Sequence, residues 1–219
     1  MAEGDPYAEV SMGTTNFVIR YEGGVLIASD SRTTRGTFIE DRNAHKMVDI
    51  SPAAEVFGGI WVVRAGTAAH TQVLSRYAHN YLCHHAMELA EGAPIRLRTV
   101  AAIFQTMIYH NKDALSVALL LTDGREIMSV HRSGAVFDHA LFASQGSGST
   151  FVDALLKSRI RPGLSLAEAE HIAKEALAFS IDTDAASGGN LVLVDARADG
   201  RSAKRIVFNA ELRGILAGA

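Results

Sequence analysis

The first regular pattern in the chain is a pair of runs, residues 13–21 and 25–34, in which β-branched and aromatic side chains are frequent. A Glu-Gly-Gly sequence at 22–24 lies between them. Runs of this kind predict strands, and glycines between them supply the positive φ angles that a tight hairpin needs. We therefore predict a β-hairpin at the start of the folded part of the chain, with Asp30 at the end of its second strand.

The rest of the pattern alternates between blocks of strands and blocks of helices. Strands are predicted at 37–40, 43–50, 56–66, 116–121, 126–131, 135–143, 190–195 and 205–209. Helices are predicted at 68–89, 94–111, 151–157 and 166–182; Thr67 caps the first, and a capping box at 165–168 begins the last. The first helix is predicted to bury one face, which carries Val73, Leu74, Tyr77, Tyr81 and Leu82.

This order of elements predicts two stacked, mostly antiparallel sheets with a helical layer on each side. The fold class is therefore α+β. No Pro-, Gly- or Ser-rich linker divides the 219 residues, so we expect one domain. Segment 1–13 is polar and has no periodicity, and we interpret it as a detachable leader that precedes a domain at 14–219.

Composition argues against several classes of function. A net charge of -3 and a pI near 6.3 offer no basic surface for nucleic acid. No apolar run approaches the roughly 20 residues that span a bilayer. The single cysteine, Cys83, excludes an internal disulfide and fits a reducing compartment. We therefore expect a protein of the cytosol or nucleus that binds neither nucleic acid nor membrane.

The candidate chemistry centres on the bond between Gly13 and Thr14. If that bond is cut, Thr14 carries a hydroxyl and a free α-amine, which are a nucleophile and its general base on one residue. The amine must be neutral near pH 7, and a buried cation beside it favours that form. Lys46, held by Asp30, meets this need if strands bring them together. An ordinary salt bridge between a strand end and its neighbour is an equal alternative.

Two loops and one helix carry further polar groups. The Gly-Ser-Gly-Ser sequence at 146–149 could hold an anion on its amides or allow another segment to approach closely. Segment 184–189 could bond a charged amine or simply end the preceding helix. His79 and Cys83 share a helical face, but no third ligand at zinc spacing follows. We therefore predict neither a metal site nor a cofactor.

Taken in order, these motifs resemble those of the catalytic β-subunits of the proteasome core particle, which are N-terminal nucleophile hydrolases. The resemblance covers residues 11 to 209. Asp30 follows Thr14 by sixteen residues and Lys46 follows it by thirty-two, and this spacing is specific when the other motifs are present. Those motifs lie at 13–15, 24–34, 64–69, 146–149 and 184–189.

The resemblance implies the four-layer αββα sandwich of this family and autocatalytic removal of the leader at Gly13–Thr14. The Thr14 hydroxyl would then attack peptide carbonyls, with its own amine as the base. Lys46 would lower the pKa of that amine, Asp30 would orient Lys46, and the amide of Gly66 would help to stabilise the oxyanion. The groups that position the new amino terminus would be Ser147, Asp184 and Ser187.

Among the subunit types, the resemblance is to the eukaryotic caspase-like type, called beta-1. Arg64 stands at the base of the pocket for the side chain before the cut, where a guanidinium would pair with aspartate or glutamate. Ala68 and Thr34 would also contact the substrate. An arginine neutralised within the chain is the alternative. The sequence departs from the family pattern at Asn16, at His70 and in a longer segment at 51–59.

The implied partners are other proteasome α- and β-subunits, in stacked seven-membered rings, and unfolded polypeptide substrates. The implied location is the cytoplasm and nucleus. Two alternatives are a structural subunit that keeps its leader and serves assembly only, and a bacterial relative that forms rings of one chain type.

Overall fold

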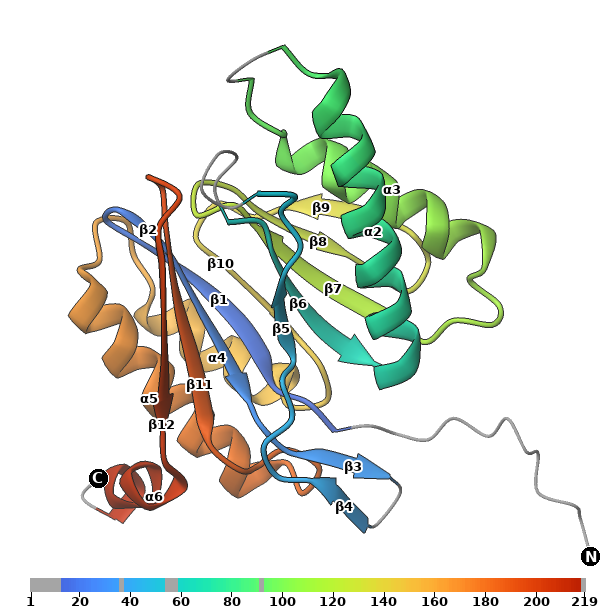
Figure 1. Ribbon diagram of the computed structural model, residues 1–219. Helices are drawn as coiled ribbons and strands as arrows, with labels where there is room; N and C mark the ends of the chain where they lie inside the picture. The colour runs from blue at the N-terminus through green and yellow to red at the C-terminus, as the bar shows by residue number, and fades with distance from the viewer. Residues whose placement is uncertain (1–12, 36–37, 54–58, 91–92, 218–219) are drawn as a thin grey trace, which may run out of the picture.

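The computed structural model describes residues 13–35, 38–53, 59–90 and 93–217 (Figure 1). Of the predicted leader, only Gly13 is among these residues. Parts of the predicted strands 37–40 and 56–66 and of the longer segment 51–59 also lie outside them. In the described part, sheets and helices form separate layers, as an α+β fold requires.

The first sheet is built around the predicted hairpin, which forms β1 (Asn16–Tyr21) and β2 (Gly24–Asp30). Gly23 between them has a φ of 104°, so the turn uses the glycine as predicted. The five-stranded sheet has the order β10-β1-β2-β11-β12, with every pair antiparallel. Its other strands are β10 (Phe142–Gln145), β11 (Leu191–Arg197) and β12 (Ser202–Val207).

The second sheet has the order β5-β6-β7-β8-β9, and it is also antiparallel throughout. Its strands are β5 (Met47–Asp49), β6 (Trp61–Gly66), β7 (Val117–Thr122), β8 (Ile127–Val130) and β9 (Val136–Asp138). A separate two-stranded sheet pairs β3 (Thr33–Arg35) with β4 (Phe38–Asp41).

Three hydrophobic clusters hold the layers together. Val18 of β1 packs between the two large sheets against Val63 and Leu120, whereas Phe17 and Ile19 point to the opposite face. This alternation is the period of two that a strand imposes. The opposite face packs on α4 (Ser149–Arg159), α5 (Leu166–Thr183) and α6 (Asn209–Ala217). The outer face of the second sheet packs on α2 (Ala68–Glu88) and α3 (Leu97–His110).

The hairpin also places the candidate site. Thr14 lies two residues before β1 and Asp30 ends β2, so the pairing of these strands brings both to one end of the first sheet. Lys46 directly precedes β5, and its carbonyl accepts a 2.8 Å hydrogen bond from the N–H of Arg64 on β6. The second sheet therefore delivers Lys46 and Arg64 to the same end.

The predicted single strand at 135–143 is wrong. The chain forms β9 in the second sheet and then β10 in the first, so it crosses between sheets at residues 139–141. Both short strands are rich in apolar residues, and the sequence pattern does not mark the point where a strand changes its partner.

The predicted buried face of α2 is partly wrong. Leu74 and Leu82 are buried, but Val73, Tyr77 and Tyr81 are 39%, 51% and 59% exposed. Smaller residues face the sheet in their place, which lets the helix lie close to it. The buried residues of α2 are Thr71, Leu74, Ser75, Ala78 and Leu82.

The start of one helix and the presence of another also differ from the prediction. Helix α3 begins at Leu97 rather than at Pro94, because the backbone of Arg96 is extended. Helix α6 was not predicted; it follows β12, where the sequence indicated only a strand at 205–209. No helix in the described part of the chain is long and apolar enough to cross a membrane.

The capping box of α5 makes a testable contribution to stability. The Ser165 hydroxyl accepts from the N–H of Glu168 at 3.3 Å, and the Glu168 carboxylate accepts from the N–H of Ser165 at 2.8 Å. We expect Ser165→Ala to lower the free energy of unfolding by about 1 kcal/mol, measured by chemical denaturation. Ser158→Ala, which removes only a bond to a carbonyl of its own helix, is the control. Equal losses in both variants would contradict the capping role.

Candidate active site

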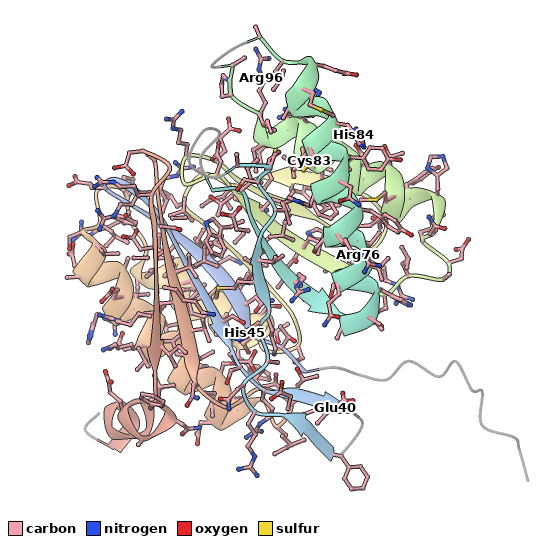
Figure 2. All side chains as sticks on the ribbon, in the orientation of Figure 1. Glu40, His45, Arg76, Cys83, His84 and Arg96 are labelled. Carbon is pink, nitrogen blue, oxygen red and sulfur yellow. The ribbon has the colours of Figure 1, made fainter. Side chains whose placement is uncertain are left out.

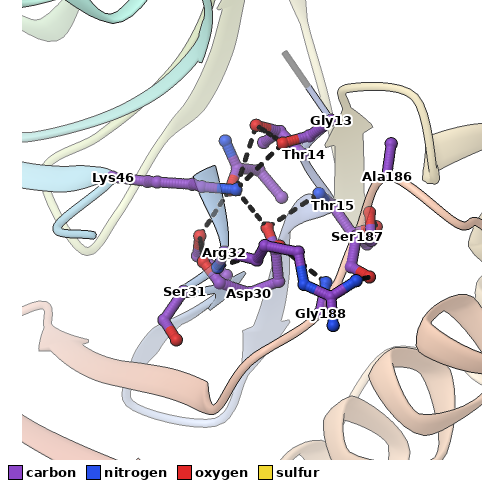
Figure 3. A network of polar contacts seen from close by, with 12 residues as sticks. Gly13, Thr14, Thr15, Asp30, Ser31, Arg32, Lys46, Ala186, Ser187 and Gly188 are labelled. Atoms are coloured by element: carbon purple, nitrogen blue, oxygen red, sulfur yellow. Dashed lines mark hydrogen bonds and ion pairs between the residues drawn. The ribbon is translucent and has the colours of Figure 1, made fainter. Parts of the chain in front are cut away.

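Three buried side chains meet where β1 begins (Figure 3). The Nζ of Lys46 lies 2.6 Å from Oδ1 of Asp30 and 3.0 Å from Oγ1 of Thr14. Thr14, Asp30 and Lys46 are 4%, 0% and 9% exposed. The structure thus brings together the hydroxyl, the ammonium and the carboxylate that the sequence analysis singled out.

Burial changes the acid–base behaviour of this cluster. It lowers the pKa of the Lys46 ammonium, because the charged form loses its hydration, and the Asp30 carboxylate opposes that shift. Burial likewise raises the pKa of Asp30, whereas Lys46 and two backbone N–H groups favour its ionised form. Lys46 therefore gives up its proton more readily than a lysine in water does.

The carbonyl group of Gly13 contacts both Thr14 and Lys46. Its oxygen accepts hydrogen bonds from Oγ1 of Thr14 at 2.7 Å and from Nζ of Lys46 at 3.2 Å. Its N–H donates to Oγ1 of Thr34 at 3.1 Å. A Cβ at this position would lie 2.1 Å from Cβ of Ala186, so only glycine fits without displacing the neighbouring loop. Hydrogen bonds to the N–H and to the carbonyl oxygen of Gly13 therefore fix the position of the Gly13–Thr14 peptide bond.

The nitrogen of Thr14 has its own set of partners. It donates to Oγ of Ser147 at 3.1 Å, and that hydroxyl donates to Asp184 at 2.6 Å. Ser187 donates to the same carboxylate oxygen at 2.7 Å. Burial alone would raise the pKa of Asp184, but these two hydroxyls and the N–H of Ala186 outweigh it and lower that pKa. The loop at 184–187 thus presents an ionised carboxylate close to Thr14.

Three residues to which the sequence analysis gave no role, Thr15, Arg32 and Gly188, complete the surroundings of Asp30. The N–H groups of Thr15 and Gly188 donate to its two carboxylate oxygens, each at 3.0 Å. Arg32 lies against Gly188 and donates to the carbonyl of Ser187 at 3.1 Å. All three lie inside the motifs at 13–15, 24–34 and 184–189, which is the signal that could have found them.

A cavity of about 490 Å³ opens beside Thr14. Arg64 and Ala68, which the resemblance implied would contact substrate, line it, and so does Gly66, the implied oxyanion donor. Thr34 is buried and binds Gly13, and it is Thr33 that lines the cavity. Other residues that line the cavity are Glu40, Asp41, Ala44, His45, Thr71 and Gln72.

Arg64 is held in this cavity without a carboxylate partner among the described residues. Its guanidinium donates to the carbonyl of His45, and its own carbonyl accepts from the side-chain amide of Asn16 at 2.9 Å. The Nε of Arg64 is buried with no hydrogen-bond partner in the described part. Burial lowers the pKa of the guanidinium, so a carboxylate that entered the cavity would relieve an unfavourable charge.

Cys83 lies away from this site. Figure 2 shows it on α2, well separated from His45 at the site. Its Sγ is 3.5 Å from Nε2 of His79, whose other ring nitrogen contacts the carbonyl of Ile50 at 3.1 Å. The described residues hold no group of three or more histidine, cysteine, aspartate or glutamate side chains arranged to bind a metal.

Comparison with known proteins identifies the family. A family model described as "Proteasome subunit" matches residues 10–195. The chain is 31% identical over 206 residues to "Proteasome subunit beta type-1" of Saccharomyces cerevisiae, which covers 91% of this chain and 90% of that protein. For "Proteasome subunit beta type-6" of Dictyostelium discoideum, the identity is 31% over 196 residues, with 85% and 86% covered. For "Proteasome subunit beta type-9" of Homo sapiens, it is 31% over 207 residues, with 93% and 90% covered. The chain therefore belongs to the proteasome subunit family, where its relatives are β-type subunits.

Proposed function

We propose that this chain is an active threonine endopeptidase of the proteasome core particle, formed when it cleaves its own Gly13–Thr14 bond. The observation that carries the proposal is the position of Lys46, whose Nζ lies 3.0 Å from the Thr14 hydroxyl and 3.2 Å from the Gly13 carbonyl oxygen. A structural subunit would have no need of this arrangement. The proposed fold is the four-layer αββα sandwich of N-terminal nucleophile hydrolases.

Leader removal begins with attack of the Thr14 Oγ1 on the Gly13 carbonyl carbon. The neutral form of Lys46, favoured by burial, accepts the hydroxyl proton. The tetrahedral intermediate then collapses: the C–N bond breaks, and the proton that Lys46 accepted passes to the Thr14 nitrogen, which leaves as a free amine. The product is an ester between Gly13 and the Thr14 hydroxyl. Water hydrolyses this ester, which releases residues 1–13 and restores the Thr14 hydroxyl beside the free amine.

The same groups then act on substrate. The Thr14 amine accepts the hydroxyl proton while Oγ1 attacks a peptide carbonyl, and it returns that proton to the leaving amine. The Lys46 ammonium keeps the pKa of the Thr14 amine low enough for this role. Gly66 lines the cavity, and its N–H is the proposed oxyanion donor, a contribution often worth about 3 kcal/mol. Water hydrolyses the acyl-enzyme. Ser147, Asp184 and Ser187 hold the amine.

The proposed specificity is caspase-like, with cleavage after aspartate or glutamate. Arg64 supports it, because this cation lines the cavity and has no carboxylate partner in the described part of the chain. The proposed partners are other α- and β-subunits in stacked seven-membered rings and unfolded polypeptides. The proposed location is the cytoplasm and nucleus. A subunit that keeps its leader, or a bacterial ring of one chain type, would be the alternative.

The first test is the nucleophile itself. We expect Thr14→Ala to retain its leader and to lose acidic-site peptidase activity, because no hydroxyl remains to attack either carbonyl. The intact mass of the chain in its assembled complex and the hydrolysis of fluorogenic peptides measure the two effects. Thr14→Ser keeps the hydroxyl and should keep both activities at a reduced rate. Full activity in Thr14→Ala would overturn the mechanism.

A second test separates maturation from turnover. Gly13→Ala should slow leader removal severalfold, because the new Cβ must displace the backbone of Ala186. Chains that do mature lack residue 13, so their kcat should equal that of the wild type. Gly214→Ala is a control, because no atom that the structure describes lies within 4 Å of a Cβ placed there. The intact mass of the chain over time measures the rate of leader removal. A normal rate in Gly13→Ala would contradict the close contact between residue 13 and Ala186.

The third test concerns specificity. Arg64→Gln should reduce kcat/KM for cleavage after aspartate or glutamate by about 10- to 100-fold, since a charge-assisted hydrogen bond is lost. Cleavage after neutral residues should change little. Arg76→Gln, an exposed arginine on α2, is the matched control. If the preference for acidic residues survives in Arg64→Gln, another residue sets it.

A further inference from the structure

A row of buried hydroxyl groups runs from helix α5 to the loop beside Thr14. The Oγ of Ser180 lies 2.6 Å from Oγ1 of Thr15, and Oγ1 of Thr15 lies 2.7 Å from Oγ of Ser187. Ser187 in turn donates to the Asp184 carboxylate at 2.7 Å. Thr15, Ser180 and Ser187 are each 0% exposed. Water therefore does not compete for these bonds.

Counting protons fixes the direction of the row. Each hydroxyl has one proton to donate, and an ionised carboxylate only accepts. Ser187 spends its proton on Asp184, so it accepts from Thr15; Thr15 has then spent its own proton, so it accepts from Ser180. All the protons point one way, from α5 to Asp184. Hydrogen bonds aligned head to tail in this way strengthen one another.

A second path of hydrogen bonds joins Asp184, where the row ends, to the nitrogen of Thr14. Ser147 also donates its proton to Asp184, at 2.6 Å, so its oxygen is free to accept the N–H of Thr14 at 3.1 Å. If Asp184 shifted, the Ser147 hydroxyl could turn and donate to the nitrogen instead. A hydroxyl that donated to the free amine would occupy the lone pair that a general base needs.

We propose that Thr15 and Ser180 are positioning residues for the catalytic amine. They fix the loop that carries Ser187 and Asp184, and that loop fixes the direction in which Ser147 donates. Thr15 also holds Asp30 through its N–H at 3.0 Å, so one residue braces both carboxylates of the site. This inference rests on the proposed peptidase function.

The main test is a pair of substitutions at Thr15. Thr15→Val keeps the shape of the side chain and removes the hydroxyl, whereas Thr15→Ser keeps the hydroxyl and removes a methyl group. In the assembled complex, we expect kcat to fall about tenfold in Thr15→Val with KM within about twofold, since only alignment is lost. Thr15→Ser should keep kcat within about twofold. If Thr15 served only to pack its methyl group, kcat would instead fall more in Thr15→Ser than in Thr15→Val.

A second variant tests the far end of the row. Ser180→Ala removes its first donor, and we expect a smaller fall in kcat, about threefold, with KM unchanged. Ser75→Ala is the matched control, because Ser75 is also a buried helical serine, but its hydroxyl bonds only the Thr71 carbonyl of its own helix, at 2.8 Å. Equal effects of the two alanines on kcat would contradict the role of Ser180.

Amide hydrogen exchange of residues 184–188 gives a readout that does not need activity. This loop should exchange at least about threefold faster in Thr15→Val than in the wild type, and no faster in Thr15→Ser. If the wild type shows no Thr14-dependent hydrolysis, the proposed function fails, and the exchange rates alone decide the inference. Unchanged exchange in Thr15→Val, or an unchanged kcat in an active complex, would overturn it.

Discussion

The site depends on keeping one ammonium group, that of Lys46, inside the protein. Taking such a charge out of water costs several kcal/mol, and the Asp30 carboxylate at 2.6 Å compensates for it. A pair of this kind adds little net stability, but the loss of one partner would cost about 3–5 kcal/mol because the other charge stays buried. Asp30 also binds the N–H groups of Thr15 and Gly188. The ion pair therefore fixes the positions of both sheets and of the loop after α5.

Close contact between backbones makes this arrangement possible. A Cβ on Gly146, whose φ is 102°, would lie 2.0 Å from the carbonyl oxygen of Thr14, and one on Gly148 would lie 1.9 Å from Oγ1 of Thr15. The loop before α4 thus wraps around two residues whose positions β1 already determines. The sequence left open whether this glycine-rich loop binds an anion or lets a segment approach. In the structure, its glycines serve the second purpose.

Much of the fold could be predicted because strand and helix periods are local properties. The hairpin, the alternation of strand blocks with helix blocks, and the capping box of α5 all follow from neighbouring residues. The crossing between β9 and β10 and the buried face of α2 could not, because they depend on which surface a segment meets. The same limit applies to the site. The motifs that carry the family resemblance identified Thr14, Asp30 and Lys46, which spacing alone did not. The hydrogen bond between Thr15 and Ser180 joins residues 165 positions apart, and no motif marks it.

Under the proposed function, one set of contacts serves two reactions in turn. In the uncut chain, Lys46 contacts the Gly13 carbonyl oxygen and the Thr14 hydroxyl together, and the oxygen of Ser147 accepts the N–H of Thr14. Cleavage converts that amide nitrogen into an amine while Ser147, Asp184 and Lys46 keep their places. The charges and hydrogen bonds that hold the precursor are thus already oriented for the base that cleavage creates. Such preorganisation lowers the barrier to turnover, because these charged and polar groups do not have to be brought together anew for each reaction.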